Sequence, residues 1–555
     1  MFIKTVSAPR KNSKPVRYVQ IVESRRPPDG GPPRHKILLN LGREDEIDQT
    51  RVAALIELLG RFSDEPPSPG AAPVDGLELG GSRDLGVPFV IEGLWKEYKL
   101  GEFLRAQLRS RKIAFSAERA IFAMIAHRAH EPTSKLQDFH WLHDEGFLPS
   151  DQDLELQHFY RALDFLEENH EALEQALFDQ RRDLFNRDTK LVFFDTTTIS
   201  FEVEDDPEEP QIGGLRQYGR PKDGRTSHRV ILAGMAVDPL GLPLLSQVFP
   251  GNTMDAQTIK PVLKRLKALG VDKTTFVMDR GGVSEENLEA IRSQGLHYIV
   301  GLRLRRAREL HAVIDADKSP YETVADGNGL LVRAIKHEGR RLVICYSPAS
   351  AERDLRLRGR AVERLNERLE AMRKMKKPAK AEAAILSHGM FARWVVRDAA
   401  GNLVLSREAV AAEARCDGTF VLETNNDKLT ASEVALGYKS LLLVESAWRA
   451  LKHSLDIAPV FHRKDERLKA HVTLCMIAYL LERTAELRTE RSFDEVRRLL
   501  RPLRAQEIRR GGESLWQPTK LSPAMADVFK KLQMAPPEKV LHSGPLPRRD
   551  EATPV

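Results

Sequence analysis

The sequence contains few cysteines, no long apolar run and only a small excess of positive charge. Its three cysteines, Cys345, Cys416 and Cys475, lie far apart and form no Cys-x2-Cys pair, so neither a disulfide framework nor a cysteine zinc site is suggested. No apolar stretch approaches the roughly 20 residues of a membrane-spanning helix, and the N-terminus lacks the continuous apolar segment of a secretory signal. We therefore expect a cytoplasmic protein without a membrane partner.

The charge balance gives only a weak indication of a polyanionic partner. The chain has 86 basic and 80 acidic side chains, a net charge of +6, so local clusters of charge must identify any such partner. With 555 residues, of which 41% are hydrophobic, the chain can build several cores, and the usual size of domains predicts three or four of them.

The N-terminal third of the chain changes from strand to helix patterns. The runs "RYVQIVES" and "HKILLNLGR" predict a β-hairpin, which forms a domain over 1–62 with a short helix at about 45–62. The Pro-rich stretch "SDEPPSPGAAP" places a linker over 63–89. Apolar residues at helical spacing then predict a helical domain over 90–187, to which we assign DNA binding.

Several side chains of this helical domain have two interpretations. Phe139 and Trp141 suit either a core or DNA contacts, and the core is favoured because they occur at helical spacing. His127 and His130, beside Glu131, have a spacing that can bind metal, but no further ligand is nearby in sequence, so a helix surface is favoured.

Residues 188–303 predict the first part of a catalytic core. Strands are expected at 190–202, in the two halves of "HRVILAGMAVDPLGLPLLSQVF", and in "TTFVMD" and "HYIVGLR", with helices at 255–270 and 284–295. This order predicts an α/β fold with a mixed five-stranded sheet and helices on both faces, as in an RNase H-like core. We place a β-rich insertion domain at 304–425, the second part of the core at 426–485, a C-terminal helical region for DNA or dimer contacts at 486–535, and a disordered tail at 536–555.

Three acids occur where a core would not favour them. Asp195 ends the strand in "KLVFFDTTTIS", Asp279 ends "TTFVMD", and Glu445 interrupts an apolar helix face in "YKSLLLVESAW". Each alone has a simple explanation, because Asp often caps turns and a helical Glu is usually solvated. Together they can converge beyond the carboxyl ends of the strands and bind Mg²⁺, which prefers oxygen ligands. The threonines after Asp195 can support such a site, although strand propensity alone also explains them.

The residues around Glu445 repeat at helical spacing. Tyr438, Glu445 and Lys452 are seven residues apart, about two turns, so one helix would place them on one face together with Arg449. A plain amphipathic helix with an ion pair from Glu445 to Arg449 is the alternative.

These motifs resemble the DDE transposases of bacterial insertion sequences, in particular the branch with a Tyr-x2-Arg-x3-Glu-x6-Lys signature. In "YKSLLLVESAWRALK", Tyr438, Glu445 and Lys452 match the signature and Leu441 replaces its Arg. "FFDTTTISFE", "GRPKDGR", "LPLLSQVFPGNTMDAQTI" and "VMDRGGVSEENLEAI" are similar to other family segments. The resemblance is strong over about 190–480.

The resemblance implies a DNA-cleaving and DNA-joining enzyme. Its active site would hold two Mg²⁺ or Mn²⁺ ions on Asp195, Asp279 and Glu445, hydrolyse DNA at the inverted repeats that end the element, and join the free 3′-hydroxyl to target DNA, most simply by cut-and-paste. It further implies a synaptic complex of at least two protomers on double-stranded DNA, associated with the bacterial nucleoid. The expected DNA contacts are Tyr438, Lys452, Arg449, Arg220, Lys222, Arg225 and Arg280.

Basic segments suit a DNA partner, since Lys and Arg neutralise phosphates. One is the loop "RQYGRPKDGRTSHR", and another holds six arginines between Arg497 and Arg510; for the second, a solvated surface is an equal alternative. Two other functions fit the same residues: an RNase H-like metal-dependent nuclease or resolvase that cleaves without joining, and a non-catalytic DNA-binding protein derived from a transposase.

Overall fold

The computed structural model describes residues 2–10, 13–25, 34–43 and 77–545, apart from 152, 186–189, 202–213, 220–228, 303, 305–307, 326, 459, 461 and 511–512. The chain divides into two compact units, Met1–Leu77 and Glu78–Val555.

The first unit contains a three-stranded antiparallel sheet in the order β1 (Phe2–Arg10), β2 (Ser13–Arg25), β3 (Arg34–Arg43). The hairpin predicted from the two β-branched runs is therefore present as β2 and β3. β1 was not predicted. It contains Pro9, where its register with β2 shifts, as is usual for an edge strand. The helix predicted at about 45–62 lies outside the described residues.

The second unit begins with a strand and a helical region. The helices are α2 (Gly86–Glu97), α3 (Leu100–Leu108), α4 (Ala117–His130), α5 (Lys135–Asp144) and α6 (Leu156–Phe185). Ser116 and Ser134 cap α4 and α5, each accepting a hydrogen bond from a first-turn backbone N–H, which satisfies a donor that the helix leaves free. The helices predicted for this region are thus present.

The prediction of a linker over 63–89 is wrong from residue 77 onward, because β4 (Leu77–Asp84) and the start of α2 lie there. Asp84 explains why this polar, glycine-rich stretch is ordered. Its buried carboxylate accepts a hydrogen bond from Trp141 Nε1 at 3.1 Å and lies 3.1 Å from His130 Nε2. It also pairs with Arg504. These contacts join β4 to the helices and to the C-terminal strands.

The two histidines of α4 are buried, so the prediction of a helix surface is wrong. His127 Nδ1 lies 2.8 Å from Asp138 Oδ1 and its ring stacks on Trp141 at 4.6 Å. Trp141 itself is 3% exposed, which confirms its prediction as a core residue. Among the described residues, no group of histidines, cysteines and acids could hold a metal ion.

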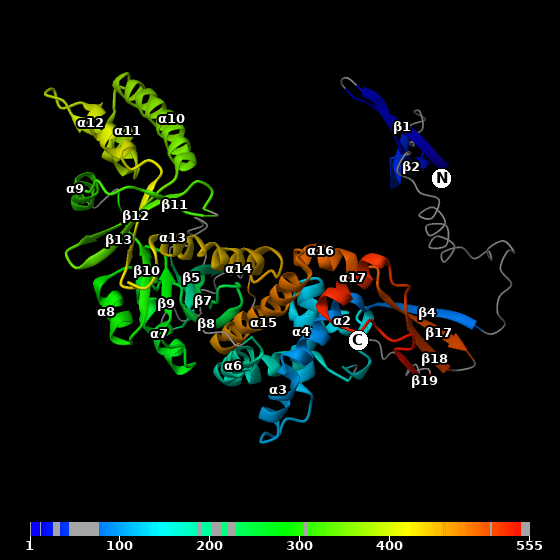
Figure 1. Ribbon diagram of the computed structural model, residues 1–555. Helices are drawn as coiled ribbons and strands as arrows, with labels where there is room; N and C mark the ends of the chain where they lie inside the picture. Colours follow the sequence, from blue (N-terminus) through cyan, green and yellow to red (C-terminus); the bar gives the residue numbers. More distant parts are fainter. Residues whose placement is uncertain are drawn as a thin grey trace. The chain divides into compact units, whose positions relative to one another are not determined.

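The central element of the second unit is a ten-stranded mixed sheet (Figure 1). Its five predicted strands are β5 (Leu191–Ser200), β7 (Arg229–Val237), β8 (Pro243–Pro250), β9 (Thr275–Met278) and β10 (His297–Gly301). They lie in the order β8-β7-β5-β9-β10. β5, β9 and β10 are parallel, whereas β7 is antiparallel to β5 and β8.

Helices cover both faces of this sheet. On one face, α7 (Asp255–Ala268) and α8 (Glu285–Ser293) pack against a core that includes Val192, Phe194 and Phe276. On the other face, α13 (Ala431–Lys439) and α14 (Leu442–His453) pack against a core that includes Phe193 and Val277. Side chains on these strands therefore alternate between the faces, as pleated strands require.

The prediction of a five-stranded sheet is wrong because the inserted segment extends the sheet. β11 (Glu322–Thr323), β12 (Leu331–His337), β13 (Arg340–Tyr346) and β16 (Thr419–Thr424) continue it beyond β10, and β6 (Gln217–Tyr218) pairs with β7. The insertion is also not mainly β. Its helices are α9 (Arg308–Ala316), α10 (Pro348–Arg373), α11 (Ala379–Ser387) and α12 (Arg407–Ala414). It also contains a small hairpin of β14 (Val395–Arg397) and β15 (Leu403–Leu405).

The C-terminal region is not purely helical, contrary to the prediction for 486–535. After α16 (Phe493–Leu500), the strands β17 (Arg504–Arg510) and β18 (Glu513–Pro518) form a hairpin, followed by α17 (Pro523–Leu532). β19 (His542–Pro545) lies in the stretch predicted to be a disordered tail. Together with β4 these strands form a four-stranded sheet in the order β19-β18-β17-β4.

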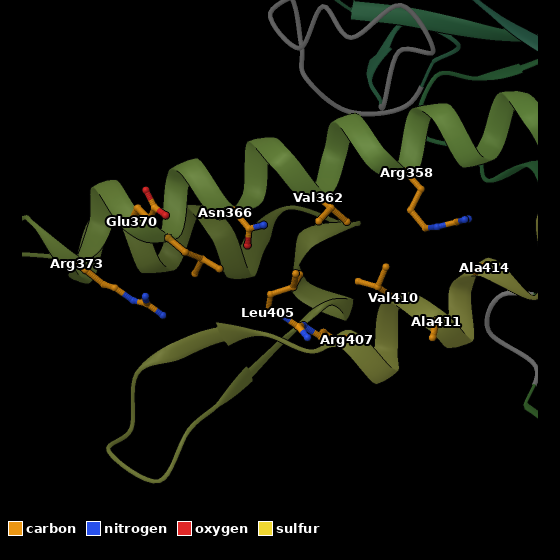
Figure 2. A pocket seen from close by; sticks show the side chains of 11 residues that line it. Arg358, Val362, Asn366, Glu370, Arg373, Leu405, Arg407, Val410, Ala411 and Ala414 are labelled. Atoms are coloured by element: carbon orange, nitrogen blue, oxygen red, sulfur yellow. The ribbon is translucent and has the colours of Figure 1, made fainter.

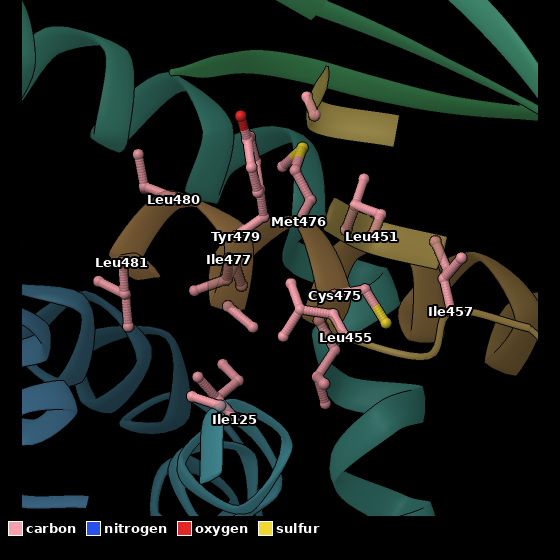
Figure 3. Packing of buried hydrophobic residues seen from close by; sticks show 14 of the residues in the cluster. Ile125, Leu451, Leu455, Ile457, Cys475, Met476, Ile477, Tyr479, Leu480 and Leu481 are labelled. Carbon is pink, nitrogen blue, oxygen red and sulfur yellow. The ribbon is translucent and has the colours of Figure 1, made fainter. Parts of the chain in front are cut away.

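One helix, α15 (Asp465–Thr489), connects the sheet to the helical region. It contacts β8 of the sheet, α4 and α6 of the helical region, and α16 and α17. Figure 3 shows Cys475, Met476, Ile477 and Leu480 of α15 among side chains from several elements, including Ile125 and Leu451. Because this helix is buried along most of its length, the helical region and the sheet share one continuous core.

In the described part of the chain, no helix has the length and apolar composition to cross a membrane.

The buried Glu482 of α15 makes stability depend on pH. Burial raises the pKa of Glu482 from 4.5 to about 8, against the opposing effect of Arg497, whose Nη2 lies 3.1 Å from the carboxylate. The folded state therefore binds the proton more tightly than the unfolded chain. Protonated Glu482 therefore contributes to the stability of the folded state. This contribution is complete below the pKa that Glu482 has in the unfolded chain, and it is lost as the pH rises through the pKa that Glu482 has in the folded protein.

We expect Glu482→Gln, which is neutral at every pH, to become more stable relative to the wild type as the pH rises from about 5 to about 8, by at most about 1.4 kcal/mol per pH unit. Urea unfolding of both proteins across this range measures the difference. A difference that does not change with pH would contradict the assignment.

Candidate functional site

Two of the predicted acids lie side by side at the end of neighbouring parallel strands. In the β5–β9 pairing, Phe194 is opposite Met278. Asp195 and Asp279 are the residues that directly follow this pair in the sequence. β9 ends at Met278, whereas β5 continues to Ser200 beside β7. Asp195 is half-buried and Asp279 is exposed. The sheet thus holds both carboxylates at the point where β9 ends.

The alternation along the strands indicates which face these acids share. Phe193 and Val277 belong to the core beneath α13 and α14, and Asp195 and Asp279 are each two residues further on. Because residues i and i+2 point to the same face of a strand, Asp195 lies on the α13 and α14 side of β5, and the hydrogen bond from Tyr438 of α13 links Asp279 to the same side. The indole Nε1 of Trp448, on α14, donates to the backbone oxygen of Asp195 at 3.4 Å.

Tyr438 of α13 contacts one of the acids directly. Its hydroxyl donates to Asp279 Oδ1 at 3.0 Å. Burial raises the pKa of Tyr438, and the charges of Asp279 and Glu445 raise it further, so the phenol stays protonated and remains a donor at neutral pH. Gly301 at the end of β10 makes room for the ring, since a Cβ there would lie 2.3 Å from the tyrosine oxygen.

Glu445 lies in the first turn of α14 and is exposed. It is three residues before Trp448, which places the two on the same side of the helix. The charge of Glu445 acts on Tyr438, so this acid lies on the same side of the sheet as the other two. Within the described residues, however, no three acids gather closely enough to hold a metal ion.

The prediction that Tyr438, Glu445 and Lys452 line one helix is wrong, because the helix breaks at Ser440 and Leu441. The Ser440 hydroxyl donates to the Leu436 carbonyl at 2.9 Å, beside the backbone bond from Ser440 N to the same oxygen. The next backbone bonds span three residues, from Leu441 N to Tyr438 O and from Val444 N to Leu441 O. Leu441, at the signature Arg position, is 7% exposed and packs into the core.

A third aspartate near the strand ends was missed by the sequence analysis. Asp255, the first residue of α7, accepts a hydrogen bond from Thr196 Oγ1 at 2.6 Å. Asp195, Asp255 and Asp279 line one small pocket of about 40 Å³ together with Gly281 and Gly282. In the sequence, Asp255 is an acid at the start of a predicted helix. Such acids are ordinarily explained by their favourable interaction with the helix dipole. Thr196 thus supports the site, beyond its strand propensity.

The predicted DNA contacts lie in different places. Arg280 and Arg449 are exposed, and Lys452 is half-buried two turns beyond Glu445 on α14. Arg220, Lys222 and Arg225 lie outside the described residues. The hydroxyl of Tyr438 donates to Asp279.

The cluster between Arg497 and Arg510 is largely part of the protein's own framework. Arg497, Arg501, Arg504 and Arg509 form ion pairs with Glu482, Glu131, Asp84 and Glu507 respectively. For this cluster, internal pairing therefore accounts for four of the six arginines, and only Arg498 and Arg510 have no ion pair among the described residues.

A larger pocket lies away from the acids, inside the insertion. It has a volume of about 620 Å³ and runs between α10, β15 and α12. Figure 2 shows Val362, Leu405 and Val410 along it, with Arg358, Arg373 and Arg407 at its border. None of the three predicted acids lines this pocket.

Gly301→Ala tests the placement of Tyr438. The new Cβ would lie 2.3 Å from the tyrosine oxygen, so the ring must leave Asp279 or β10 must shift. We expect the free energy of unfolding to fall by about 1–3 kcal/mol in urea denaturation. Gly359→Ala in α10 is the control, because a Cβ there meets nothing within 4 Å and should stabilise the helix by about 0.5–1 kcal/mol. Equal stability of Gly301→Ala and the wild type would rule out this packing.

Comparison with known proteins identifies the family. Residues 186–481 match the family described as "Transposase DDE domain", and residues 3–72 match the "IS1634 family transposase, N-terminal domain". No curated protein matches the sequence. Among solved structures, a piggyBac transposase synaptic complex with hairpin DNA is similar with 10% identity and a TM-score of 0.35, covering 77% of this chain and 82% of that one.

A Mos1 transposase paired-end complex with the left transposon end has 12% identity and a TM-score of 0.14, covering 46% of this chain and 68% of that one. Scores of this size carry no argument about the fold, so the assignment rests on the domain match, which spans more than half of the sequence. The chain belongs to the transposases with a DDE domain.

Proposed function

We propose that this DNA transposase binds the terminal inverted repeats of an insertion sequence, cleaves the DNA at the element ends and joins the 3′-hydroxyl ends to target DNA in a cut-and-paste reaction. The observation that supports the proposal most is that Asp195 and Asp279 directly follow Phe194 and Met278, which are paired between β5 and β9. We further propose that the strand order β8-β7-β5-β9-β10 represents an RNase H-like core within the larger sheet.

Asp195, Asp279 and Glu445 would be the ligands of Mg²⁺ or Mn²⁺ once they come closer together than they lie among the described residues of this structure. Their oxygen donors suit hard divalent cations, and strand pairing and packing fix Asp195 and Asp279 on a rigid sheet. Two ions bound there would activate the attacking water or 3′-hydroxyl and stabilise the leaving oxygen. Asp255 is a further carboxylate beside them, and its hydrogen bond to Thr196 ties the start of α7 to β5.

We assign Tyr438 a positioning role toward Asp279. Its phenol donates to one carboxylate oxygen, which orients the carboxylate and leaves the second oxygen for another ligand. The raised pKa of Tyr438 keeps this donor protonated throughout the neutral range. Tyr438 would therefore act through Asp279 rather than through a phosphate of the DNA.

Asp195→Asn, Asp279→Asn and Glu445→Gln should each abolish Mg²⁺-dependent cleavage of an inverted-repeat end while leaving DNA binding intact, because each removes a ligand charge and not a DNA contact. Glu363→Gln, on an exposed position of α10, is the matched control and should cleave normally. Strand joining is measured with a pre-cleaved end and a plasmid. Cleavage at the wild-type rate by any of the three variants would remove that residue from the assignment, and cleavage without joining would indicate a nuclease.

Tyr438→Phe distinguishes between two roles of Tyr438, which are the positioning of Asp279 and a contact with a DNA phosphate. If the hydroxyl positions Asp279, cleavage should slow by about tenfold to a hundredfold, as expected for a lost partner of a metal ligand, with unchanged affinity for the DNA end. Gel-shift titrations and single-turnover cleavage measure the two quantities. Weaker DNA binding with an unchanged cleavage rate would instead support a phosphate contact.

A further inference from the structure

A second pocket lies away from the acids, between the start of α5 and the beginning of α15. It has a volume of about 230 Å³ and shares no lining residue with the pocket of Asp195. Arg128, Lys135, His462 and His471 are among the residues that line it. Four nitrogen-bearing side chains from three segments of the chain thus surround one cavity.

Two of these side chains are cations that are almost completely buried. Arg128 is 2% exposed and Lys135 is 4% exposed. Lys135 Nζ pairs with Asp138 Oδ2 at 2.9 Å. The Nη atoms of Arg128 donate to the carbonyl oxygens of Leu455, Asp456 and Thr133, which carry no full negative charge.

Nearby acids do not fully balance these charges. The carboxylate of Asp138 is shared between Lys135 and His127, and Asp456 is exposed at the border of the pocket. Arg128 Nε is buried and has no hydrogen-bond partner among the residues that the structure describes. Buried cations are usually paired with an anion, since an unpaired buried charge is costly. Arg128 therefore has the capacity for one more acceptor.

Two histidine rings complete the lining, with their centroids 5.8 Å apart. His471 Nε2 lies 3.2 Å from the carbonyl oxygen of Ile457. Burial, together with the charges of Lys135, Arg467 and Arg128, lowers the pKa of His462 to about 4. The effect of these three cations on one ring agrees with a positive potential in the pocket.

The start of α5 adds to this potential. Ser134 caps the helix and, with Thr133, lines the pocket, so the positive end of the helix dipole lies at the cavity. Helix N-termini combined with Arg side chains are a common way to bind phosphate. The volume of the pocket leaves room for a phosphate group and part of what it is attached to.

We infer that this pocket binds a phosphate group through Arg128, Lys135 and the N-terminus of α5. The phosphate belongs to the DNA backbone or is a free phosphate, since both present the same oxygens to the pocket. The inference does not depend on the metal site, because the two pockets are separate.

Leu136, which lines the pocket and is 43% exposed, offers a test that leaves the buried groups unchanged. Leu136→Glu adds a negative charge at the border, and Leu136→Gln is its neutral control of equal size. Inorganic phosphate is titrated into the full-length protein by calorimetry at constant ionic strength. We expect Leu136→Gln to bind phosphate like the wild type and Leu136→Glu to bind it about tenfold more weakly.

Repeating the titration with a short DNA duplex present identifies the source of the phosphate. If the site holds a backbone phosphate, the duplex competes with inorganic phosphate and Leu136→Glu binds DNA more weakly; if it holds a free phosphate, both bind together. No phosphate binding by the wild type, or equal binding by the two variants, would overturn the inference. Lys135→Gln serves as a second test, since it should weaken phosphate binding while circular dichroism confirms that the protein is folded. DNA cleavage, measured separately, shows whether the proposed function holds independently.

Discussion

Parallel pairing between β5 and β9 is the constraint on which the candidate site depends. The register that sets Phe194 opposite Met278 makes Asp195 and Asp279 adjacent, although 84 positions separate them in the sequence. A shift of one strand by one residue would turn its carboxylate to the opposite face of the sheet. Phe193 and Val277 on one face and Phe194 and Phe276 on the other hold the register, so the packing of apolar side chains determines where the charged ones stand.

Much of this arrangement could be predicted because its signals are local. β5, β7, β8, β9 and β10 are short apolar runs separated by turn residues, and α7 and α8 begin and end where acids, Ser284 and Gly295 indicate. Asp279 directly follows β9 as predicted, whereas the prediction that Asp195 ends its strand is wrong, because β5 continues to Ser200. Trp141 could be assigned to a core because it occurs at helical spacing, and it is buried as expected.

The features that were missed depend on partners far away in sequence. β16 pairs with β10 after more than a hundred intervening residues, and no local pattern indicates that the insertion extends the sheet. β4 lacks an apolar run and is ordered through Asp84, whose partners include Trp141 and Arg504. The break at Ser440 and Leu441 lies within a stretch whose local pattern favours a helix. The place of Asp255 near the strand ends depends on its contact with Thr196, which is 59 positions away in the sequence.

The segment from α10 to α12 leaves and re-enters the sheet at neighbouring points, since Ser347 N donates to Gly418 O at 2.9 Å and Tyr346 is opposite Thr419. It also has an apolar core of its own, around Leu365, Leu369 and Trp394. Its ends would therefore stay closed by strand pairing whatever the length of chain between them. Residues 348–417 therefore form a segment that could be replaced by a foreign domain without separating the strands at its two ends.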